Sequence, residues 1–507
     1  MYNYWSSFYD VRFIQIKSSS HHYKEPEIMG KIIYLLLSFL IMTNNLFANN
    51  NELLLTRELS QSLALINSNA NIWPKFKISS KPIIVYFSNQ HHYAYYFSPI
   101  NSNWKIQSDQ SFPVYFLDHD EYEIDNLSWS DGNIIDGQPS FVFGLETIKD
   151  ISNRDILHLL FHERFHIFQF EDFPVQIYNF GTYTGFNQIE NVKLTYIEDL
   201  ALGEYLTNDN IEALKDYVAI NQYRQKLMGD ISTIYEATKE NMEGIADYYG
   251  WSVAISNEAE RNQAMITTYK NKCGIDKLIK CQLQDRYYFT GAAVGIALDN
   301  LSVGDWKDKL VKNKSFIRNQ LHQYFSFSDT QISQRVNQAK ERYNYAEITR
   351  PIEVAIERYK ERRSKEMNSY NNQPGVKLNI ERRPCNLFGM TMADENFYID
   401  SNIQLYINQI GNSSCPDHSI IVNYFNIPYV LKTENIGRIQ VKIDNDTLLE
   451  IDGKSISAKD LSATDTAIDF NNLYLKNTVI EIEIKNRSAR LDIKGNELNL
   501  ITNFDKE

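Results

Sequence analysis

The stretch SNRDILHLLFHERFHIFQF, residues 152–170, contains two histidines four residues apart among aromatic and aliphatic side chains. Either of its first two residues, Ser152 or Asn153, can cap a helix, because a short polar side chain accepts a hydrogen bond from a free backbone N–H. Apolar residues then recur at helical spacing, so the stretch predicts a helix with a broad apolar surface. The two histidines lie in the middle of this helix, in a setting that predicts burial.

His162 and His166 are spaced as two imidazole ligands of one metal ion would be. Residues four apart share one face of a helix, so both rings can reach the same ion. Glu163 follows the first histidine and would point toward the substrate side of that ion, which makes the H-E-x-x-H pattern typical of zinc-dependent hydrolysis. His158, one turn earlier on the same face, is expected to pack beside the site, because catalytic zinc helices leave the third ligand to another element.

A third ligand is expected from the stretch ENMEGIADYYGW, residues 240–251. We favour Glu243, since the small residues Gly244 and Ala246 would allow two helices to approach closely around the ion. Glu198, in YIEDLALGEYL, is closer in sequence to the histidines and has a similar helical setting, so it is the alternative ligand. If Glu243 binds the ion, Glu198 is a structural residue of its helix.

The pattern E-G-x-A-x-Y that begins at Glu243 resembles the gluzincin metallopeptidases, in which a helix carrying H-E-x-x-H is joined by a glutamate from a second helix. This resemblance, to the aminopeptidase N and thermolysin-like branches, implies that His162, His166 and Glu243 hold a zinc ion. Asp247 matches an E-x-x-x-D pattern of thermolysin-like members, whose aspartate orients the first histidine. In the aminopeptidase N branch the glutamate follows the histidines much sooner, so the longer interval here implies a helical insertion.

The stretch DRYYFTGAAVGIALDNL, residues 285–301, extends the resemblance. Tyr288, three residues before Gly291, is similar to the tyrosine of a Y-x-x-G-A element that hydrogen-bonds the developing oxyanion in the aminopeptidase N branch. The opposing interpretation is that an aromatic pair before a helix is ordinary core. Tyr287 is the adjacent alternative, and His322 is a further one, because thermolysin-like members use a histidine.

One element of the aminopeptidases is missing. Their G-x-M-E-N element recognises a free amino terminus, whereas this chain reads DGQPSFVFGLETI at 136–148, upstream of the helix. An edge strand there could pair with the backbone of a substrate. The aminopeptidase specificity is therefore not expected to carry over.

Local patterns divide the chain into three parts. Between residues 74 and 145, short apolar runs alternate with turn residues and predict strands. From Asn153 to about Met367 helical periodicity takes over, and after the NNQPG break at 371–375 period-two stretches return. We predict an α+β protein, with an N-terminal mixed sheet, then a mostly helical zincin-like domain, then a C-terminal all-β, sandwich-like domain. The predicted domains are 49–370 and 376–507.

Residues 29–48 have the features of a signal peptide: a basic start, the apolar run IIYLLLSFLIM at 32–42, and a polar, small-residue end at Ala48. The apolar run is too short for a bilayer, which needs about 20 residues. We therefore expect an exported protein, periplasmic or secreted, with no stable membrane span; a membrane anchor is the alternative. Residues 1–28 stand where a signal peptide should begin, so we expect them to be a mis-assigned upstream extension.

Composition and charge exclude some classes of protein. The chain has 507 residues, 43% hydrophobic and 23% charged, which argues against wholesale disorder. Its formal net charge is -13, and -14 without residues 1–48, which hold four basic and three acidic residues, so nucleic-acid binding is not expected. The four cysteines favour two disulfides between neighbours, although four free thiols are the alternative. These pairs would be Cys273 with Cys281 and Cys385 with Cys415.

Together these features predict an exported zinc-dependent metallopeptidase that acts on a peptide or protein substrate. Zinc, about one ion per chain, would polarise the scissile carbonyl, while Glu163 acts as general base and Tyr288 stabilises the oxyanion. Two imidazoles, one carboxylate and an open position suit zinc best among divalent ions. The alternative is an inactive homologue, or a metal-containing binding protein whose β domain recognises a surface protein or glycan. Glu163 speaks against this alternative, because zinc binding alone does not need that carboxylate.

Overall fold

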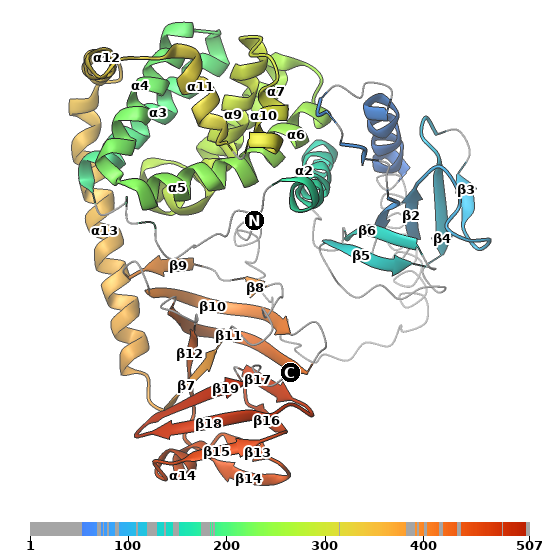
Figure 1. The fold of residues 1–507 in the computed structure, drawn as a ribbon, viewed down its shortest axis with the longest axis vertical. Helices are drawn as coiled ribbons and strands as arrows, with labels where there is room; N and C mark the ends of the chain where they lie inside the picture. The colour runs from blue at the N-terminus through green and yellow to red at the C-terminus, as the bar shows by residue number, and fades with distance from the viewer. Residues whose placement is uncertain are drawn as a thin grey trace, which may run out of the picture.

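The computed structural model divides into the three parts that the sequence predicts (Figure 1). It describes residues 53–67, 72–74, 76–78, 81–86, 91–107, 110–118, 129–135, 138–144, 152–173, 183, 185, 188–313, 315–381, 391–392, 395–399, 403–414, 419–432, 438–478 and 480–502. The α+β class, with an N-terminal mixed sheet, a mostly helical middle and a sheet-rich C-terminal part, is confirmed. The predicted signal peptide and upstream extension lie outside the described residues.

The N-terminal sheet has six strands in the order β3-β4-β2-β1-β6-β5. These are β1 (Ile83–Tyr86), β2 (His91–Tyr95), β3 (Lys105–Gln107), β4 (Val114–Asp118), β5 (Trp129–Ile135) and β6 (Gln138–Gly144). β1 pairs with β6 in parallel and with β2 in antiparallel fashion, which makes the sheet mixed. All of β1 is buried because apolar side chains cover both faces of the sheet: Ile83 and Val85 belong to the main core, and Ile84 to a smaller cluster on the opposite face.

A helix over residues 53–67, which the sequence patterns did not predict, contributes Leu59 and Leu63 to the same core as β1 and α2. The helical part contains α2 (Asn153–Asp172), α3 (Ile189–Asn208), α4 (Ile211–Met228), α5 (Asp230–Lys239), the π-helical turn η4 (Glu240–Gly244), α6 (Ile245–Ala254), α7 (Glu258–Lys272), η5 (Ile275–Lys277), α8 (Leu278–Lys280), the π-helical turn η6 (Cys281–Asp285), α9 (Arg286–Asn300), α10 (Trp306–Asn313), α11 (Ile317–Phe325), α12 (Asp329–Arg342) and α13 (Tyr345–Asn372). α5, η4 and α6 follow one another without a break, and so do α8, η6 and α9.

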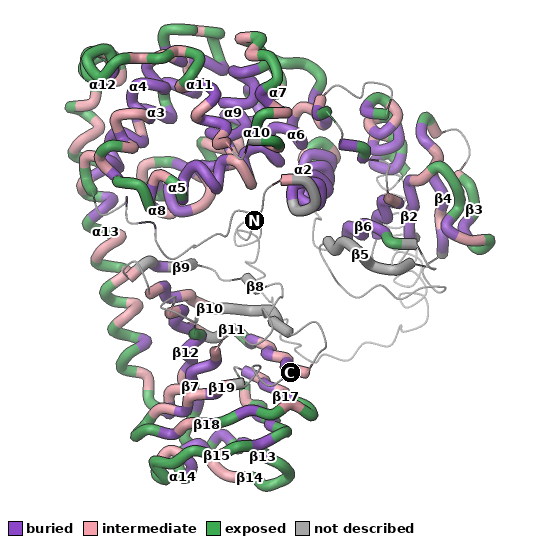
Figure 2. The backbone as a smooth tube through the Cα atoms, viewed as in Figure 1, coloured by how far each residue is buried: buried purple, intermediate pink, exposed green. Residues whose placement is uncertain are grey.

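The helix α2 lies between the sheet and the other helices, and it is buried along most of its length (Figures 1 and 2). Ser152 caps it by accepting a hydrogen bond from the backbone N–H of Asp155, as expected. Phe165 lies at the centre of an aromatic cluster, with ring centroids 5.1 Å from Trp73, 5.2 Å from Phe76 and 4.8 Å from Tyr249. Such aromatic packing fixes the rotation of α2, and with it the direction in which the histidines point.

The C-terminal part is built from β7 (Val376–Glu381), β8 (Thr391–Met392), β9 (Glu395–Tyr398), β10 (Ile403–Ser414), β11 (Ile420–Lys432), β12 (Arg438–Ile443), β13 (Leu448–Ile451), β14 (Lys454–Ser457), α14 (Ala458–Ser462), β15 (Ala467–Phe470), β16 (Leu473–Lys476), β17 (Ile480–Ile484), β18 (Ala489–Lys494) and β19 (Glu497–Thr502). The long strand β11 pairs along one edge with β10, and along the other with β17 through residues 420–424 and with β12 through residues 430–432. It therefore belongs to two layers, whose inward side chains alternate with outward ones and share one core.

The β-rich part is joined to the end of α13 (Figure 1). The Tyr370 hydroxyl donates a hydrogen bond of 2.9 Å to the backbone carbonyl of Gln440, and Tyr370 packs with Phe397 and Leu405. Lys442 donates to the carbonyls of Asn371 and Gln373 at 2.7 and 2.6 Å. These contacts fasten the last turn of the helix to the first strands that follow it.

Two expectations concern export. Cys273 and Cys281 form a disulfide, whereas Cys385 and Cys415 lie outside the described residues. Within the part of the chain that the structure describes, every helix is too short or too polar to cross a bilayer.

Candidate metal centre

Two imidazoles of α2 meet at one point inside the protein. His162 and His166 are 2% and 0% exposed, and their Nε2 atoms lie 2.9 Å apart. The spacing of four residues places them one helical turn apart on one face. Asp247 of α6 lies 3.1 Å from the Nδ1 of His162, so the histidine face is turned toward α6.

Glu243 brings the third donor to this point. Its Oε2 lies 3.7 Å from the Nε2 of His162 and 3.4 Å from that of His166. The three ligand atoms lie within 4.8 Å of one another, and all three residues are buried. Glu243 belongs to the π-helical turn η4, and such turns inside α-helices are frequent at functional sites. Its other oxygen, Oε1, lies 3.9 Å from the ammonium of Lys239 one turn earlier.

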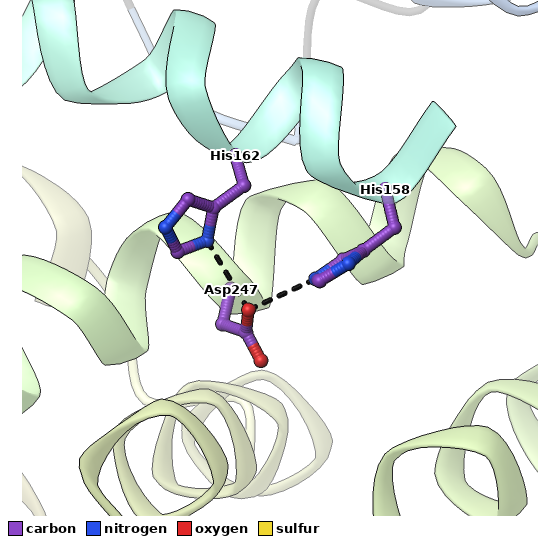
Figure 3. Close-up of side chains that lie close together, drawn as sticks. All are labelled: His158, His162 and Asp247. Carbon is purple, nitrogen blue, oxygen red and sulfur yellow. Dashed lines mark hydrogen bonds and ion pairs between the residues drawn. The ribbon is translucent and has the colours of Figure 1, made fainter. Parts of the chain in front are cut away.

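Asp247 and His158 support His162 (Figure 3). The Oδ1 atom of Asp247 lies 3.1 Å from Nδ1 of His162 and 2.9 Å from Nε2 of His158. Trp251 donates to Oδ2 at 3.1 Å, and its ring stacks on His158 with centroids 3.9 Å apart. Ligand atoms of His158, His162 and Asp247 also lie within 4.8 Å of one another, but contact of the carboxylate with both rings accounts for that closeness without an ion. Asp247 therefore contacts the rings of both His158 and His162.

Gln169 fixes His166, and sequence reasoning missed it. Its amide nitrogen donates to the carbonyls of Asn241 and Met242 at 2.9 and 3.1 Å. The amide oxygen, which can only accept a hydrogen bond, is therefore the atom that faces His166. That oxygen lies 2.8 Å from Nδ1 of His166, which must therefore carry the hydrogen. The Nε2 of His166 is left with a lone pair that faces His162. The only hint in the sequence is a polar residue three positions after the second histidine.

This donor set fits a metal ion. A carboxylate only accepts, so Asp247 favours the tautomer of His162 in which Nδ1 carries the hydrogen and Nε2 a lone pair. Two lone pairs and one carboxylate oxygen then face one another, and among the described residues Glu243 Oε2 receives no hydrogen bond of regular geometry. A cation between these buried lone pairs would compensate them. Two imidazoles and one carboxylate are a ligand set of catalytic zinc.

The electrostatics of the cluster also favour a positive charge. Burial opposes the imidazolium form, but Asp247 and Glu243 outweigh it and raise the pKa of His162 to about 9. Burial opposes the ionised form of Glu243 too, yet the nearby rings of His162 and His166 hold its pKa well below the ordinary value. The site thus keeps its carboxylate ionised and attracts positive charge between the rings.

Glu163 is close enough to His162, His166 and Glu243 to interact with their charges. It is 2% exposed, and among the described residues its Oε2 accepts no hydrogen bond. Burial raises its pKa, while the charges of His162 and His166 act in the opposite sense. A carboxylate with a raised pKa beside a cation site suits proton transfer near neutral pH.

Tyr288 forms one wall of the site and is only partly buried. Its ring stacks on His162 with centroids 5.6 Å apart, and its hydroxyl hydrogen-bonds to the carboxylate of Glu243. Its neighbour Tyr287 is fully buried and donates to the carbonyl of Gln282 at 2.5 Å, so it belongs to the core. His322 lies elsewhere, bonded to Asn221 at 3.0 Å, and burial lowers its pKa to about 3.

Glu198, the alternative third ligand, is placed in a different cluster. It is 0% exposed, pairs with Arg224 and Arg286, and accepts a hydrogen bond of 2.7 Å from Asn221. Its two oxygens are therefore committed to an ion-pair network. The structure brings together His162, His166 and Glu243, with Glu163, Asp247 and Tyr288 around them.

No family model, no curated protein and no solved structure matches the chain.

Proposed function

We propose that this chain is a zinc-dependent metallopeptidase. One observation carries the proposal: two imidazole Nε2 atoms and one carboxylate oxygen converge inside the protein. The Nδ1 atoms of the same two rings contact Asp247 and Gln169, which orient the rings. Structural zinc sites are closed by four protein ligands, whereas three ligands with an open position are typical of catalytic zinc. Glu163 beside the donor set adds a group that metal binding alone does not require.

His162, His166 and Glu243 would hold the ion. When bound, the metal supplies Lewis acidity, which polarises the scissile carbonyl and acidifies a water molecule. Glu163 accepts a proton from the attacking water and then gives it to the leaving amine. Tyr288 turns its hydroxyl from Glu243 to the oxyanion that develops on the substrate. Asp247 and Gln169 keep the two rings aligned throughout.

The proposed setting is outside the cytoplasm. The signal-like segment at 29–48 and the disulfide between Cys273 and Cys281 both support export to the periplasm or beyond. The proposed substrate is a peptide or protein.

The test compares the zinc-loaded protein with its Glu163→Gln variant on a library of quenched fluorescent peptides. We expect cleavage by the unchanged protein, and a loss of about 10²–10⁴-fold or more in the variant, because the general base is gone. Zinc content should be equal in both, since Glu163 is not a ligand. Cleavage at equal rates would reject the assigned mechanism, and zinc-loaded protein that cleaves no peptide would favour the binding-protein alternative.

A further inference from the structure

The π-helical turn that carries Glu243 is hydrogen-bonded on two sides to other parts of the helical region. On one side, Gln169 of α2 donates to the carbonyls of Asn241 and Met242 in the turn, at 2.9 and 3.1 Å. On the other side, the Asn241 side chain accepts from the backbone N–H of Ile317 at 2.8 Å and donates to the carbonyl of Ser315 at 3.0 Å. The turn is thus tied both to the helix of the histidines and to the start of α11.

The first residue of the turn is fixed in the same way. Glu240 is 0% exposed, and its carboxylate accepts from Arg318 of α11 at 2.7 Å and from Thr290 of α9 at 2.7 Å. A π-helical turn has wider and poorer hydrogen bonding than an α-helix, so outside bonds are needed to hold one geometry. Residues 240, 241 and 242 all receive such bonds, and residue 243 is the proposed ligand.

Gln169 is the centre of this arrangement because it acts on two ligands at once. Its oxygen orients the ring of His166, and its nitrogen holds the backbone just before Glu243. One rigid amide therefore sets the distance between the second and third ligands. Metal sites tolerate errors of only about 0.2 Å in ligand distance.

We infer that Gln169 and Asn241 are positioning residues, which clamp the π-helical turn so that Glu243 meets the two histidines at metal-binding distance. The inference rests on the proposed function, since it assigns these residues to the same metal centre. It adds that α11, through Asn241, controls how tightly the metal is held. Loss of partners that orient metal ligands typically weakens metal binding by about 10–100-fold.

The experiment measures Zn²⁺ affinity by competition with a chelating dye, together with the melting temperature of the metal-free protein. Asn241→Ala removes two of the hydrogen bonds that link the turn to the start of α11, those with Ile317 and Ser315. Its matched control is Asn262→Ala, because Asn262, like Asn241, donates from its side chain to a backbone carbonyl, that of Leu206 at 3.0 Å, in another part of the helical region. We expect Asn241→Ala to lose about 10–100-fold in Zn²⁺ affinity. Asn262→Ala should lower only the melting temperature.

A second variant, Gln169→Glu, separates the contact of Gln169 with His166 from its contacts with the turn. A carboxylate still accepts from Nδ1 of His166, but it cannot donate to the carbonyls of the turn. If the clamp acts as inferred, this variant also loses about 10–100-fold in affinity. Unchanged affinity in Gln169→Glu and Asn241→Ala would overturn the inference while leaving the metal site standing. An unmutated protein that binds no Zn²⁺ would instead reject the proposed function itself.

Discussion

Tyr288 contacts two of the proposed metal ligands. In the structure the hydroxyl bonds to Glu243, and the ring rests against His162. Burial raises the pKa of Tyr288 well above its ordinary value, and the charge of Glu243 acts in the same direction. The group therefore stays protonated and can donate to an oxyanion that develops next to Glu243.

Replacing Tyr288 by phenylalanine should leave zinc content unchanged and lower kcat by about 10²–10³-fold, with little change in KM. The reason is that the lost hydrogen bond matters in the transition state and not in substrate binding. Steady-state kinetics on a cleaved peptide would measure it. Tyr287→Phe is the matched control, since Tyr287 loses only a core hydrogen bond to Gln282. Equal kcat losses in both variants would show that the Tyr288 hydroxyl has no specific role in the reaction.

At the scale of single residues, the sequence predicts a site best where its residues are close together in the chain. The spacing of His162 and His166 is short, and a helix puts both rings on one face, so this pair could be predicted. Small residues in the sequence favoured Glu243 over Glu198, and the fold adds their different surroundings: Glu243 lies beside the histidines, and Glu198 pairs with arginines. The role of Gln169 could not be predicted, since the carbonyls it holds lie more than 70 residues away.

At the scale of elements, glycines decide how closely the helices of the site approach. A Cβ added to Gly244 would lie 2.5 Å from the Cα of Gly291 and 2.5 Å from the carbonyl oxygen of Tyr287. Close approach at Gly244 was expected, and it occurs against α9, which carries Tyr288. The approach of α6 to α2 takes place instead at Gly250, whose added Cβ would lie 2.7 Å from the carbonyl of His158.

Gly244→Ala should therefore lower the free energy of unfolding by about 1–3 kcal/mol and weaken zinc binding, because η4 and α9 must move apart. Urea unfolding and dye competition would measure the two effects. Gly203→Ala in α3 is the control: nothing lies within 4 Å of its added Cβ, so helix propensity alone should stabilise it by about 0.5–1 kcal/mol. A Gly244→Ala variant as stable as the unchanged protein would show that the contact does not constrain the site.

The period of the apolar residues predicted the types of most elements, because it reflects which face is buried. The runs at β1, β2, β4 and β6 and those at β11, β12, β17, β18 and β19 were all found in this way. The two-layer pairing of β11 was not predictable from the strand itself, since it depends on which half of the strand meets β12 and which meets β17. The π-helical turns have no clear sequence pattern either.

At the scale of the whole molecule, a buried ion-pair network joins the helices around the site. It connects α3, α4, α5, η4, α9 and α11, and its members are at most 3% exposed. They are Arg224, Arg286 and Arg318 with Glu198, Asp199, Glu236 and Glu240. Removing one partner of a buried pair leaves an uncompensated charge, so this network ties metal-site geometry to global folding.

Glu236→Gln should lower the free energy of unfolding at pH 7 by about 3–5 kcal/mol, because Arg224 and Arg318 lose a buried partner. Although burial acts against ionisation, these arginines lower the pKa of Glu236 from 4.5 to about 2. A folded pKa below the ordinary one means that the stabilisation is present above pH 4.5 and is lost as pH falls toward 2. The difference between variant and unchanged protein should therefore shrink over that range, which urea unfolding at several pH values would measure.

Glu212→Gln is the comparison for that experiment. Lys215 and Arg335 also lower the pKa of Glu212 to about 2, but its side chain is 49% exposed. Because water screens exposed pairs, we expect a change below about 1 kcal/mol. Equal effects at Glu236 and Glu212 would contradict the role of the buried network.

The measurement that tests the metal centre most directly is the zinc content of the purified protein beside its Glu243→Gln and Glu198→Gln variants, by elemental mass spectrometry after desalting. Both replacements keep the size of the side chain, and both remove a buried negative charge. We expect about one zinc ion per chain in the unchanged protein and in Glu198→Gln, and its loss in Glu243→Gln. Zinc retained in Glu243→Gln but lost in Glu198→Gln, or no zinc in the unchanged protein after reconstitution, would contradict it.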